Sequence, residues 1–439
     1  MSEVIKKARE AREASYLLAK LSTDVKDQAL YKIADSIWQH KEELVESNRK
    51  DIETAEMMLR RGEITKAMMK RLELNNEKIQ RITDMVRSVA SLDDPIGKTE
   101  YSIELDKGLE LYRVTSPIGV IAVIFESRPD VLPQIASLCL KSGNSILLKG
   151  GSEARHSNQQ LFSIIKDAVN ALPEGWIQLI EARKEIDELL KLDGYVDLII
   201  PRGSNDFVRY IQNNTRIPVL GHADGVCHVY VDNEADVDMA VNVCYDAKVQ
   251  YPSVCNAVDT ILIHEEIADK FLPHIVDRFM KRNVEMRGCS RVLESVKGGV
   301  REATSEDWGA EYLDYIVSMK VVDDVDEAIN HINTLGSHHT DAIITSNEKT
   351  AYRFMTSLDS ANVFWNASTR FSDGYRYGLG SEVGISTGKI HVRGPTGLEG
   401  LTIYKYYLEG DGHIVADYED NKSKKFTHKP IDEEWKRQN

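Results

Sequence analysis

The spacing of hydrophobic residues divides the chain into stretches of different structure. In the first 92 residues, apolar side chains recur every three or four positions, as Leu30, Ile33 and Ile37 do, and this spacing predicts a series of helices. Between residues 101 and 116, apolar and polar residues alternate on both sides of Asp106-Lys107-Gly108. Alternation around a short turn that contains glycine predicts a β-hairpin.

After Pro117 the pattern is typical of alternating strands and helices. Residues 119–125 form a continuous apolar run, as a parallel strand buried on both faces does. A second alternation follows residue 258, and together they predict an α/β protein with doubly wound parallel sheets. Strands are expected at 119–125, 145–148, 176–180, 196–200, 228–232 and 260–263 and near Lys320 and Ala342, with helices at 131–141, 154–171 and 266–282.

Three stretches in the second half of the chain have a different pattern. Residues 285–308 show weak periodicity, and the tail after Gly410 is polar and charged. Residues 401–408 alternate, with Ile403, Tyr404 and Tyr406 among the apolar positions. We expect this last stretch to be a strand suited to joining a partner's sheet.

Length and charge limit the possible functions. A chain of 439 residues is too long for one core, so two or three domains are expected. The formal net charge of -15 argues against nucleic acid or an acidic membrane as a partner, because these need a basic surface. No apolar run approaches the roughly 20 residues that span a bilayer. The charged, amphipathic start of the chain is not typical of a signal peptide.

The cysteines suggest one candidate nucleophile. Their number is five, with no C-x-x-C pair, so neither a disulfide framework nor a zinc cluster is expected, and a reducing cytoplasm is the simplest location. Cys255 lies in a Pro/Ser/Asn turn between a helix-like run and an apolar run. A catalytic thiolate suits this position, and a small buried hydrophobe is the alternative.

Two glycine-containing turns join an expected strand to an expected helix. One is Lys149-Gly150-Gly151-Ser152-Glu153, and the other includes Arg202-Gly203-Ser204. Glycine lets a backbone approach a phosphate, and a helix N-terminus attracts negative charge, so the pair suggests a dinucleotide crevice. Plain turns are the alternative, because neither turn has the G-x-G-x-x-G pattern.

Other polar residues allow weaker inferences. Ser127-Arg128 follows an expected strand and is placed to meet an anion, although a surface arginine is an equal alternative. Cys227 and His228 would point to opposite sides of a strand, so no metal site is expected there. Residues 371–400 hold eight glycines, which fits either a ligand-wrapping loop or a tight crossing between domains.

Several ordered blocks of the sequence resemble the aldehyde dehydrogenase superfamily. They are 116–129, 139–144 with 148–154, 252–257, 378–387 and 393–398. The resemblance implies two doubly wound parallel-sheet domains and a β oligomerisation arm. It places a cofactor-binding domain at 1–96 and 120–232, a catalytic domain at 233–376, the arm at 97–119 and 392–415, and a polar tail at 416–439.

The resemblance also implies roles for individual residues. Cys255 matches the nucleophile, Lys149 the lysine that holds the adenosine ribose, and Glu311 the glutamate that holds the nicotinamide ribose. Gly203-Ser204 matches the turn beside the pyrophosphate. Ser152 replaces an acidic residue of NAD-preferring relatives, so NADPH is the expected cofactor.

Two departures from the superfamily pattern refine the expected reaction. Glu126-Ser127 stands where a tryptophan-asparagine pair is usual, so Ser127 or Arg128 would help the Cys255 backbone N–H to hold an oxyanion. Residues 220–224 lack the glutamate that activates water. Without that base, the resemblance implies reduction of an acyl phosphate, L-glutamyl 5-phosphate, to L-glutamate 5-semialdehyde in proline biosynthesis, with Asn366, Arg370 and Arg128 as expected substrate contacts.

The expected partners follow from this chemistry. A homodimer or larger homo-oligomer is expected, and the acyl phosphate would come from a separate protein, glutamate 5-kinase, through a transient complex. Two alternatives remain open. One is a coenzyme A-acylating or hydrolytic aldehyde dehydrogenase, and the other is a non-catalytic oligomeric scaffold.

Overall fold

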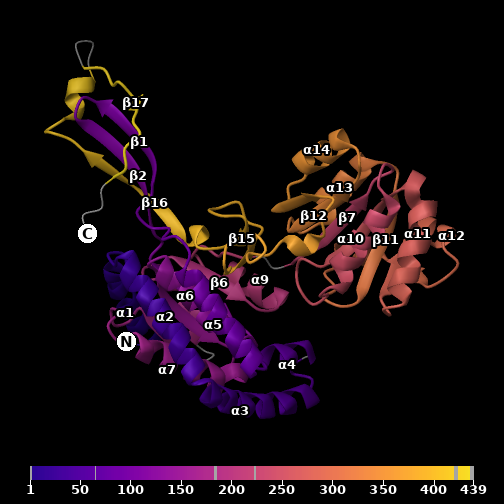
Figure 1. Cartoon of the computed structure of the whole chain (residues 1–439), viewed down its shortest axis with the longest axis horizontal. Coiled ribbons are helices and arrows are strands. Elements are labelled where there is room, and N and C mark those ends of the chain that lie inside the picture. The colour runs from indigo at the N-terminus through magenta and orange to yellow at the C-terminus, as the bar shows by residue number, and fades with distance from the viewer. Residues whose placement is uncertain (1, 65, 182–184, 222–223, 420–423, 436–439) are drawn as a thin grey trace.

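The computed structural model describes residues 2–64, 66–181, 185–221, 224–419 and 424–435. These residues form an N-terminal α/β domain, a C-terminal α/β domain and a long β arm (Figure 1). The arm projects from the N-terminal domain and points away from the C-terminal domain. In the part of the chain described, no helix has the length and apolar character needed to cross a membrane.

The N-terminal domain begins with helices, as the three- and four-residue spacing predicts. Their apolar faces are buried at Leu30, Ile33 and Ile37. The first helix is capped by Ser2, whose Oγ accepts a hydrogen bond from the Ile5 N–H at 3.3 Å. The helices are α1 (Glu3–Leu18), α2 (Thr23–Gln39), α3 (Lys41–Arg60), α4 (Lys66–Leu72) and α5 (Asn76–Ala90).

A parallel sheet forms the core of the N-terminal domain. Its described strands run in the order β5-β4-β3-β6, so the chain reverses direction across the sheet between β3 and β6. Ligands of doubly wound sheets bind at such a reversal, beyond the carboxyl ends of the strands. The elements are β3 (Val120–Phe125), α6 (Val131–Lys141), β4 (Ser145–Gly150), η1 (Ser152–Ala154), α7 (Arg155–Ala168), β5 (Ile177–Ile180), α8 (Ile186–Leu189), β6 (Leu198–Arg202) and α9 (Asn205–Asn214).

The C-terminal domain has its own parallel sheet. The described strands run in the order β10-β9-β11-β8-β7-β12-β13, with α10 and α11 packed against each other beside them. The strands are β7 (Cys227–Val231), β8 (Val258–His264), β9 (Glu285–Gly288), β10 (Val300–Glu302), β11 (Ile316–Val322), β12 (Thr340–Ile344) and β13 (Asn362–Trp365). The helices are α10 (Val237–Val249), α11 (Glu265–Met280), α12 (Ser290–Ser295), η3 (Ser305–Gly309), α13 (Val325–Leu335), α14 (Glu348–Ser357) and η4 (Thr369–Phe371).

One predicted domain boundary is wrong by a strand. Placing 120–232 in the first domain assigns the strand at 228–232 to the first sheet, but β7 pairs with β8 and β12 in the C-terminal sheet. An apolar strand carries no local signal for which parallel sheet it joins, because both neighbours in the sheet are distant in sequence. The first domain therefore ends before Cys227.

The arm is an antiparallel sheet that combines the predicted hairpin with two later segments. The hairpin, β1 (Thr99–Asp106) and β2 (Leu109–Pro117), is confirmed, and its described neighbours complete the order β16-β2-β1-β17. Strand β16 (Thr402–Glu409) confirms the strand expected at 401–408. Shorter elements connect it to the rest of the chain: β14 (Gly384–Ser386), β15 (Gly394–Thr396), η5 (Glu399–Leu401), η6 (Val415–Tyr418) and β17 (Lys429–Pro430).

The segment expected to be only a polar tail is part of the arm. Strand β17 pairs with β1, and the Trp435 ring stacks on Tyr407 with ring centroids 4.1 Å apart. The Ser102 hydroxyl donates to the Ile431 carbonyl at 2.7 Å. The polar composition of this segment does not indicate such a role, because a polar segment needs only a few contacts to cover the edge of a sheet.

A buried histidine pair lies inside the C-terminal domain. His228 on β7 shares a hydrogen bond of 2.8 Å with Asp341, and its ring lies 5.5 Å from that of His331 on α13. Burial lowers the pKa of His331 to about 3, and the neighbouring His228 and Lys320 add to the effect. His331 therefore stays neutral in the folded protein over the physiological range.

We expect this burial to make the protein sensitive to acid. An unfolded histidine titrates near 6.5, so below about pH 6.5 protons bind His331 in the unfolded chain and not in the folded one. This difference should lower the free energy of unfolding by about 2 kcal/mol between pH 7 and pH 5. In urea unfolding at the two pH values, His331→Gln should lose this part of the pH dependence, and the exposed-site variant His274→Gln should keep it. Equal pH dependence in His331→Gln and the wild type would contradict the assignment.

Candidate active site

The loop that carries Cys255 (residues 250–257) is held from three directions. The Arg71 Nη2 of α4 donates to the Ser253 carbonyl at 3.1 Å, so a helix of the N-terminal domain reaches the loop. The Cys227 thiol of β7 donates to the Cys255 carbonyl at 3.1 Å. The Thr369 hydroxyl of η4 donates to the Asn256 carbonyl at 2.7 Å. The half-buried Cys255 is thus fixed at the amino end of β8, where the two domains meet.

Glu311 and Gly225 lie beside Cys255. A Cβ atom added to Gly225 would lie 2.5 Å from the Cys255 Cβ and 2.8 Å from the Glu311 Oε1, so only glycine fits between them. The other Glu311 oxygen accepts a hydrogen bond of 2.9 Å from the Asn205 side chain, at the first turn of α9. Glu311 therefore bridges the Cys255 loop and the helix beside the expected dinucleotide crevice.

Three arginines lie near Cys255 without an ion pair among the described residues. Arg71 and Arg202 are half-buried and Arg370 is buried, all three interact electrostatically with Cys255, and burial lowers the pKa of each. Carboxylates act on them only at longer range, as Glu382 does on Arg202, and Arg370 Nε donates to the Gln250 side chain at 2.9 Å. Desolvation of a cation is costly when no ion pair offsets it. The arrangement is therefore suited to receive an anion beside the thiol.

Ser127 and Arg128 already have partners. The Ser127 N–H and hydroxyl both donate to Glu153 Oε1, at 2.5 and 3.0 Å. Arg128 forms an ion pair of 2.9 Å with Asp130, which raises the pKa of the arginine. Ser127 reaches an oxyanion only if its contact with Glu153 opens, whereas Arg128 keeps further guanidinium N–H donors beside its bond to Asp130.

The residues expected to hold a dinucleotide gather at the carboxyl ends of β3, β4 and β6. Lys149 is buried, and its Nζ donates to the Gly150 carbonyl at 2.6 Å. Ser152 is exposed at the start of η1, and Ser204 directly precedes α9, with no capping hydrogen bond from its side chain. A Cβ atom on Gly203 would lie 2.6 Å from the Glu126 carboxylate, which explains the glycine.

The two expected substrate contacts occupy different positions. Arg370 belongs to the group of arginines around Cys255. Asn366 sits in a left-handed conformation after β13, and both ends of its amide bind the Thr345 backbone, at 3.0 Å each. Asn366 therefore holds the chain after β13 in place, and its expected contact with substrate stays a prediction.

The glycine-rich segment crosses back to the N-terminal domain. A Cβ atom on Gly384 would lie 2.7 Å from the Arg202 Nη1, and one on Gly380 would lie 2.9 Å from Leu92. The side chain of Gln134 on α6 donates to the Glu382 carbonyl at 3.0 Å. Of the two readings of this segment, the tight crossing is the one that its contacts support, and the crossing brings Glu382 near Arg202.

Residues 220–224 offer no free carboxylate in their described part. Asp224 accepts hydrogen bonds from Asn205, at 2.8 Å, and from Arg209. His222 and Ala223 lie outside the described residues. In the portion of the chain described, no three His, Cys, Asp or Glu side chains are grouped to hold a metal ion.

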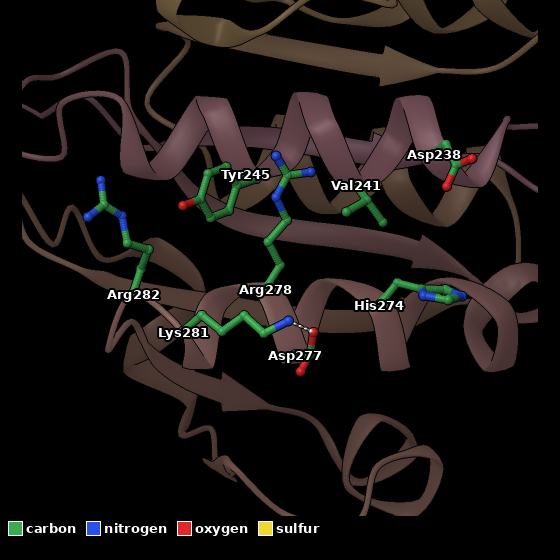
Figure 2. Close-up of a pocket in the computed structure, with 8 residues that line it drawn as sticks. All are labelled: Asp238, Val241, Tyr245, His274, Asp277, Arg278, Lys281 and Arg282. Carbon is green, nitrogen blue, oxygen red and sulfur yellow. Dashed lines mark hydrogen bonds and ion pairs between the residues drawn. The ribbon is translucent and has the colours of Figure 1, made fainter.

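A surface groove of about 440 Å³ lies elsewhere, between α10 and α11 (Figure 2). Its cations have local partners: Lys281 pairs with Asp277 at 2.6 Å, and Arg278 lies over the Tyr245 ring at 4.2 Å. None of the expected site residues lines it. The groove is therefore separate from the Cys255 site.

Comparison with known proteins decides the family. A sequence model of the aldehyde dehydrogenase family matches residues 1–289. The chain belongs to the aldehyde dehydrogenase family. It is 56% identical over 425 residues to a gamma-glutamyl phosphate reductase of Natronomonas pharaonis, with 97% of each chain covered. A relative of the same name from Acetivibrio thermocellus is 53% identical over 98% of each chain.

Solved structures extend this comparison. The crystal structure of gamma-glutamyl phosphate reductase from Thermotoga maritima matches with a TM-score of 0.90 and 41% identity, over 94% of this chain and all of that one. An acetylating aldehyde dehydrogenase of Geobacillus thermoglucosidasius shares the fold, with a TM-score of 0.67 at 17% identity. The predicted α/β fold and its aldehyde dehydrogenase family are thereby confirmed.

Sequence reasoning missed Arg71 and Arg202 as members of this site. Arg71 reads as a surface position of a short amphipathic helix, and only the folded chain brings it to Cys255. Arg202 directly precedes Gly203, and the turn was interpreted through its glycine and serine alone. The position of Arg202 does carry a signal, because a cation at the carboxyl end of a buried strand faces the usual ligand crevice.

We expect Arg202→Met to remove most of the stabilisation that inorganic phosphate gives this aldehyde dehydrogenase. Phosphate at 100 times its Kd should stabilise the wild type by about 3 kcal/mol. Without phosphate, the variant should be as stable as the wild type or more stable by about 1 kcal/mol, because an apolar chain of similar length replaces an unpaired charge. Thermal unfolding with and without phosphate measures both effects.

The matched control is Arg282→Met, in the surface groove away from Cys255. It should keep the full phosphate response. Equal stabilisation of Arg202→Met and the wild type by phosphate would remove Arg202 from the anion site.

Proposed function

We propose that the chain reduces L-glutamyl 5-phosphate to L-glutamate 5-semialdehyde and phosphate, with NADPH, in proline biosynthesis. The observation that carries this proposal is the group of three arginines near Cys255 that form no ion pair among the described residues. The substrate has an α-carboxylate at one end and a phosphate at the other, which together would neutralise such a group. Relatives that are 51–56% identical over nearly their whole length are named gamma-glutamyl phosphate reductase, which is the enzyme of this reaction.

The proposed chemistry proceeds through a thioester. The Cys255 thiolate attacks the acyl carbon, the S–C bond forms, and the bond to the phosphate oxygen breaks. When bound, the nicotinamide cofactor supplies the hydride that reduces this thioester. The S–C bond then breaks, which releases the aldehyde and regenerates the Cys255 thiolate.

The backbone N–H of Cys255 supports this reaction by donating to the oxyanion that forms at the acyl carbon. One well-placed donor of this kind contributes about 3 kcal/mol to the transition state. The peptide that carries this N–H is held at its other end, because the Val254 carbonyl accepts from the Ala257 N–H at 3.1 Å. Arg71, Cys227 and Thr369 hold the carbonyl groups of Ser253, Cys255 and Asn256 on either side of it. Preorganisation of the loop is therefore the main contribution of the surrounding residues.

The residues that would hold the cofactor fit a dinucleotide. Lys149 and Ser152 would face the adenosine ribose, Gly203-Ser204 the pyrophosphate and Glu311 the nicotinamide ribose. Glu311 lies next to both Cys255 and the first turn of α9, as a residue between nicotinamide and thiol must. The neutral and exposed Ser152 leaves room for a 2′-phosphate, which favours NADPH.

The competing readings are less well supported. A hydrolytic enzyme needs a base for water, and Asp224 is held by Asn205 and Arg209. A coenzyme A-acylating enzyme does not need three cations around its thiol. A scaffold without catalysis has no use for three arginines that are partly desolvated and form no ion pair.

We expect Cys255→Ser to abolish phosphate-dependent oxidation of L-glutamate 5-semialdehyde. A serine hydroxyl is a far weaker nucleophile at neutral pH, so the rate should fall by at least about 1000-fold. Absorbance of the reduced cofactor measures the rate, with NADP and NAD compared in parallel, and NADP should be preferred. Phosphate replaced by coenzyme A should give no reaction. Near-normal turnover by the variant, or turnover with coenzyme A, would contradict the mechanism.

We also propose that the arm joins a second copy of the chain, in the cytoplasm, where glutamate 5-kinase would supply the acyl phosphate through a transient complex. Strand β16 leaves Tyr406 and Leu408 more than half exposed, at 57% and 58%. The opposite edge of the arm sheet is already covered by β17. An apolar strand at a free edge is suited to an identical partner.

The double substitution Tyr406→Asp with Leu408→Asp should lower the mass in solution. Two charges on the exposed apolar side of β16 would oppose pairing with another copy, so light scattering should report smaller particles than for the wild type. Lys405→Asp, on the other face of the same strand, is the control and should leave the mass unchanged. An unchanged mass in the double variant would argue against β16 as the contact.

A further inference from the structure

A carboxylate of the protein occupies the place proposed for the cofactor pyrophosphate. Glu126 follows β3, and its Oε2 accepts a hydrogen bond of 3.1 Å from the Ser204 N–H at the start of α9. The same oxygen would lie 2.6 Å from a Cβ atom on Gly203. The backbone of Glu126 is fixed across the crevice, because its N–H donates to the Arg202 carbonyl at 2.9 Å.

The same arrangement recurs one strand away. Glu153 is buried, and its Oε1 accepts from both the N–H and the hydroxyl of Ser127. Its carboxylate also lies over Gly151, where an added Cβ atom would come within 2.1 Å of it. Two turns of the crevice therefore have their donors filled by carboxylates of the chain itself.

A helix N-terminus offers partial positive charge and a small number of N–H donors. A carboxylate and a pyrophosphate both carry negative charge, and at hydrogen-bonding distance they repel each other. The Ser204 N–H therefore serves either Glu126 or the cofactor.

We propose that Glu126 is an internal competitor of the cofactor pyrophosphate. It occupies the start of α9 in the free protein and turns away when the cofactor binds. This inference rests on the proposed function for the position of the cofactor. The apparent affinity is then lowered by the fraction of molecules in which Glu126 holds the site.

A purely structural role for Glu126 makes a different prediction. If the carboxylate only caps α9, its removal weakens the helix and leaves cofactor affinity unchanged or reduced. The two roles therefore move the dissociation constant in opposite directions.

The decisive experiment is titration of Glu126→Gln with NADPH, followed by cofactor fluorescence. The neutral amide should bind about 10-fold more tightly than the wild type, and stopped-flow association of NADPH should be faster by a similar factor, because more of the free protein has an open site. Asp206→Asn is the control, because this exposed acid lies in the first turn of the same helix without holding the Ser204 N–H. Its affinity should stay within about 2-fold of wild type.

Two further measurements keep the test interpretable. Glu126→Met serves as a second neutral variant, with circular dichroism to verify folding, and it should also bind more tightly. Inorganic pyrophosphate is the second probe, and the substitutions should tighten its binding in the same proportion. Unchanged or weaker binding of both probes in both variants overturns the proposal. Tighter pyrophosphate binding in a protein that binds neither NADPH nor NADH would keep the role of Glu126 and overturn the cofactor assignment.

Discussion

The candidate active site depends on holding one short loop where an edge of each sheet meets the other. Cys255 precedes β8, at the amino edge of the C-terminal sheet, while the dinucleotide turns follow strands at the carboxyl edge of the N-terminal sheet. Neither sheet alone can fix a residue between them. The loop is instead held at the carbonyl groups of Ser253, Cys255 and Asn256 by Arg71, Cys227 and Thr369, which come from both domains. A change in how the domains pack would therefore move the thiol before it disturbed either core.

The charges on the two sides of this site are arranged differently. On the side of the dinucleotide turns, backbone donors are matched by Glu126 and Glu153. Near the thiol, Arg71, Arg202 and Arg370 form no ion pair within the described residues, and burial lowers the pKa of each. Carboxylates of the chain thus occupy donors where a cofactor would bind, whereas cations without a close partner lie where an anionic substrate would react. Cofactor binding would replace the Glu126 carboxylate with a pyrophosphate, whereas substrate binding would add an anion beside the arginines.

Local pattern was enough to predict most of the helices and strands, and it failed where distant segments meet. The strand at 119–125 is apolar at every position, and the turn at 106–108 carries its glycine, so both followed from their own residues. The sheet that contains Cys227–Val231 depends on partners about 30 and 110 residues away. Arg71 and Trp435 look like ordinary surface residues until a fold brings them to Ser253 and Tyr407. Glu126 departs from the tryptophan usual in the superfamily, but the spacing of residues does not indicate its hydrogen bond to Ser204.

The order of strands in the arm has a consequence for synthesis of the chain. The hairpin β1–β2 is made early, but its neighbours β16 and β17 come from residues 402–430, after both domains. During translation the hairpin therefore remains a two-stranded ribbon with bare edges, which is only marginally stable by itself. The ribosome releases the covering strands late, so the arm sheet is completed only after both domains have had time to fold. Strand order thus makes the arm sheet one of the last parts of the fold to be completed.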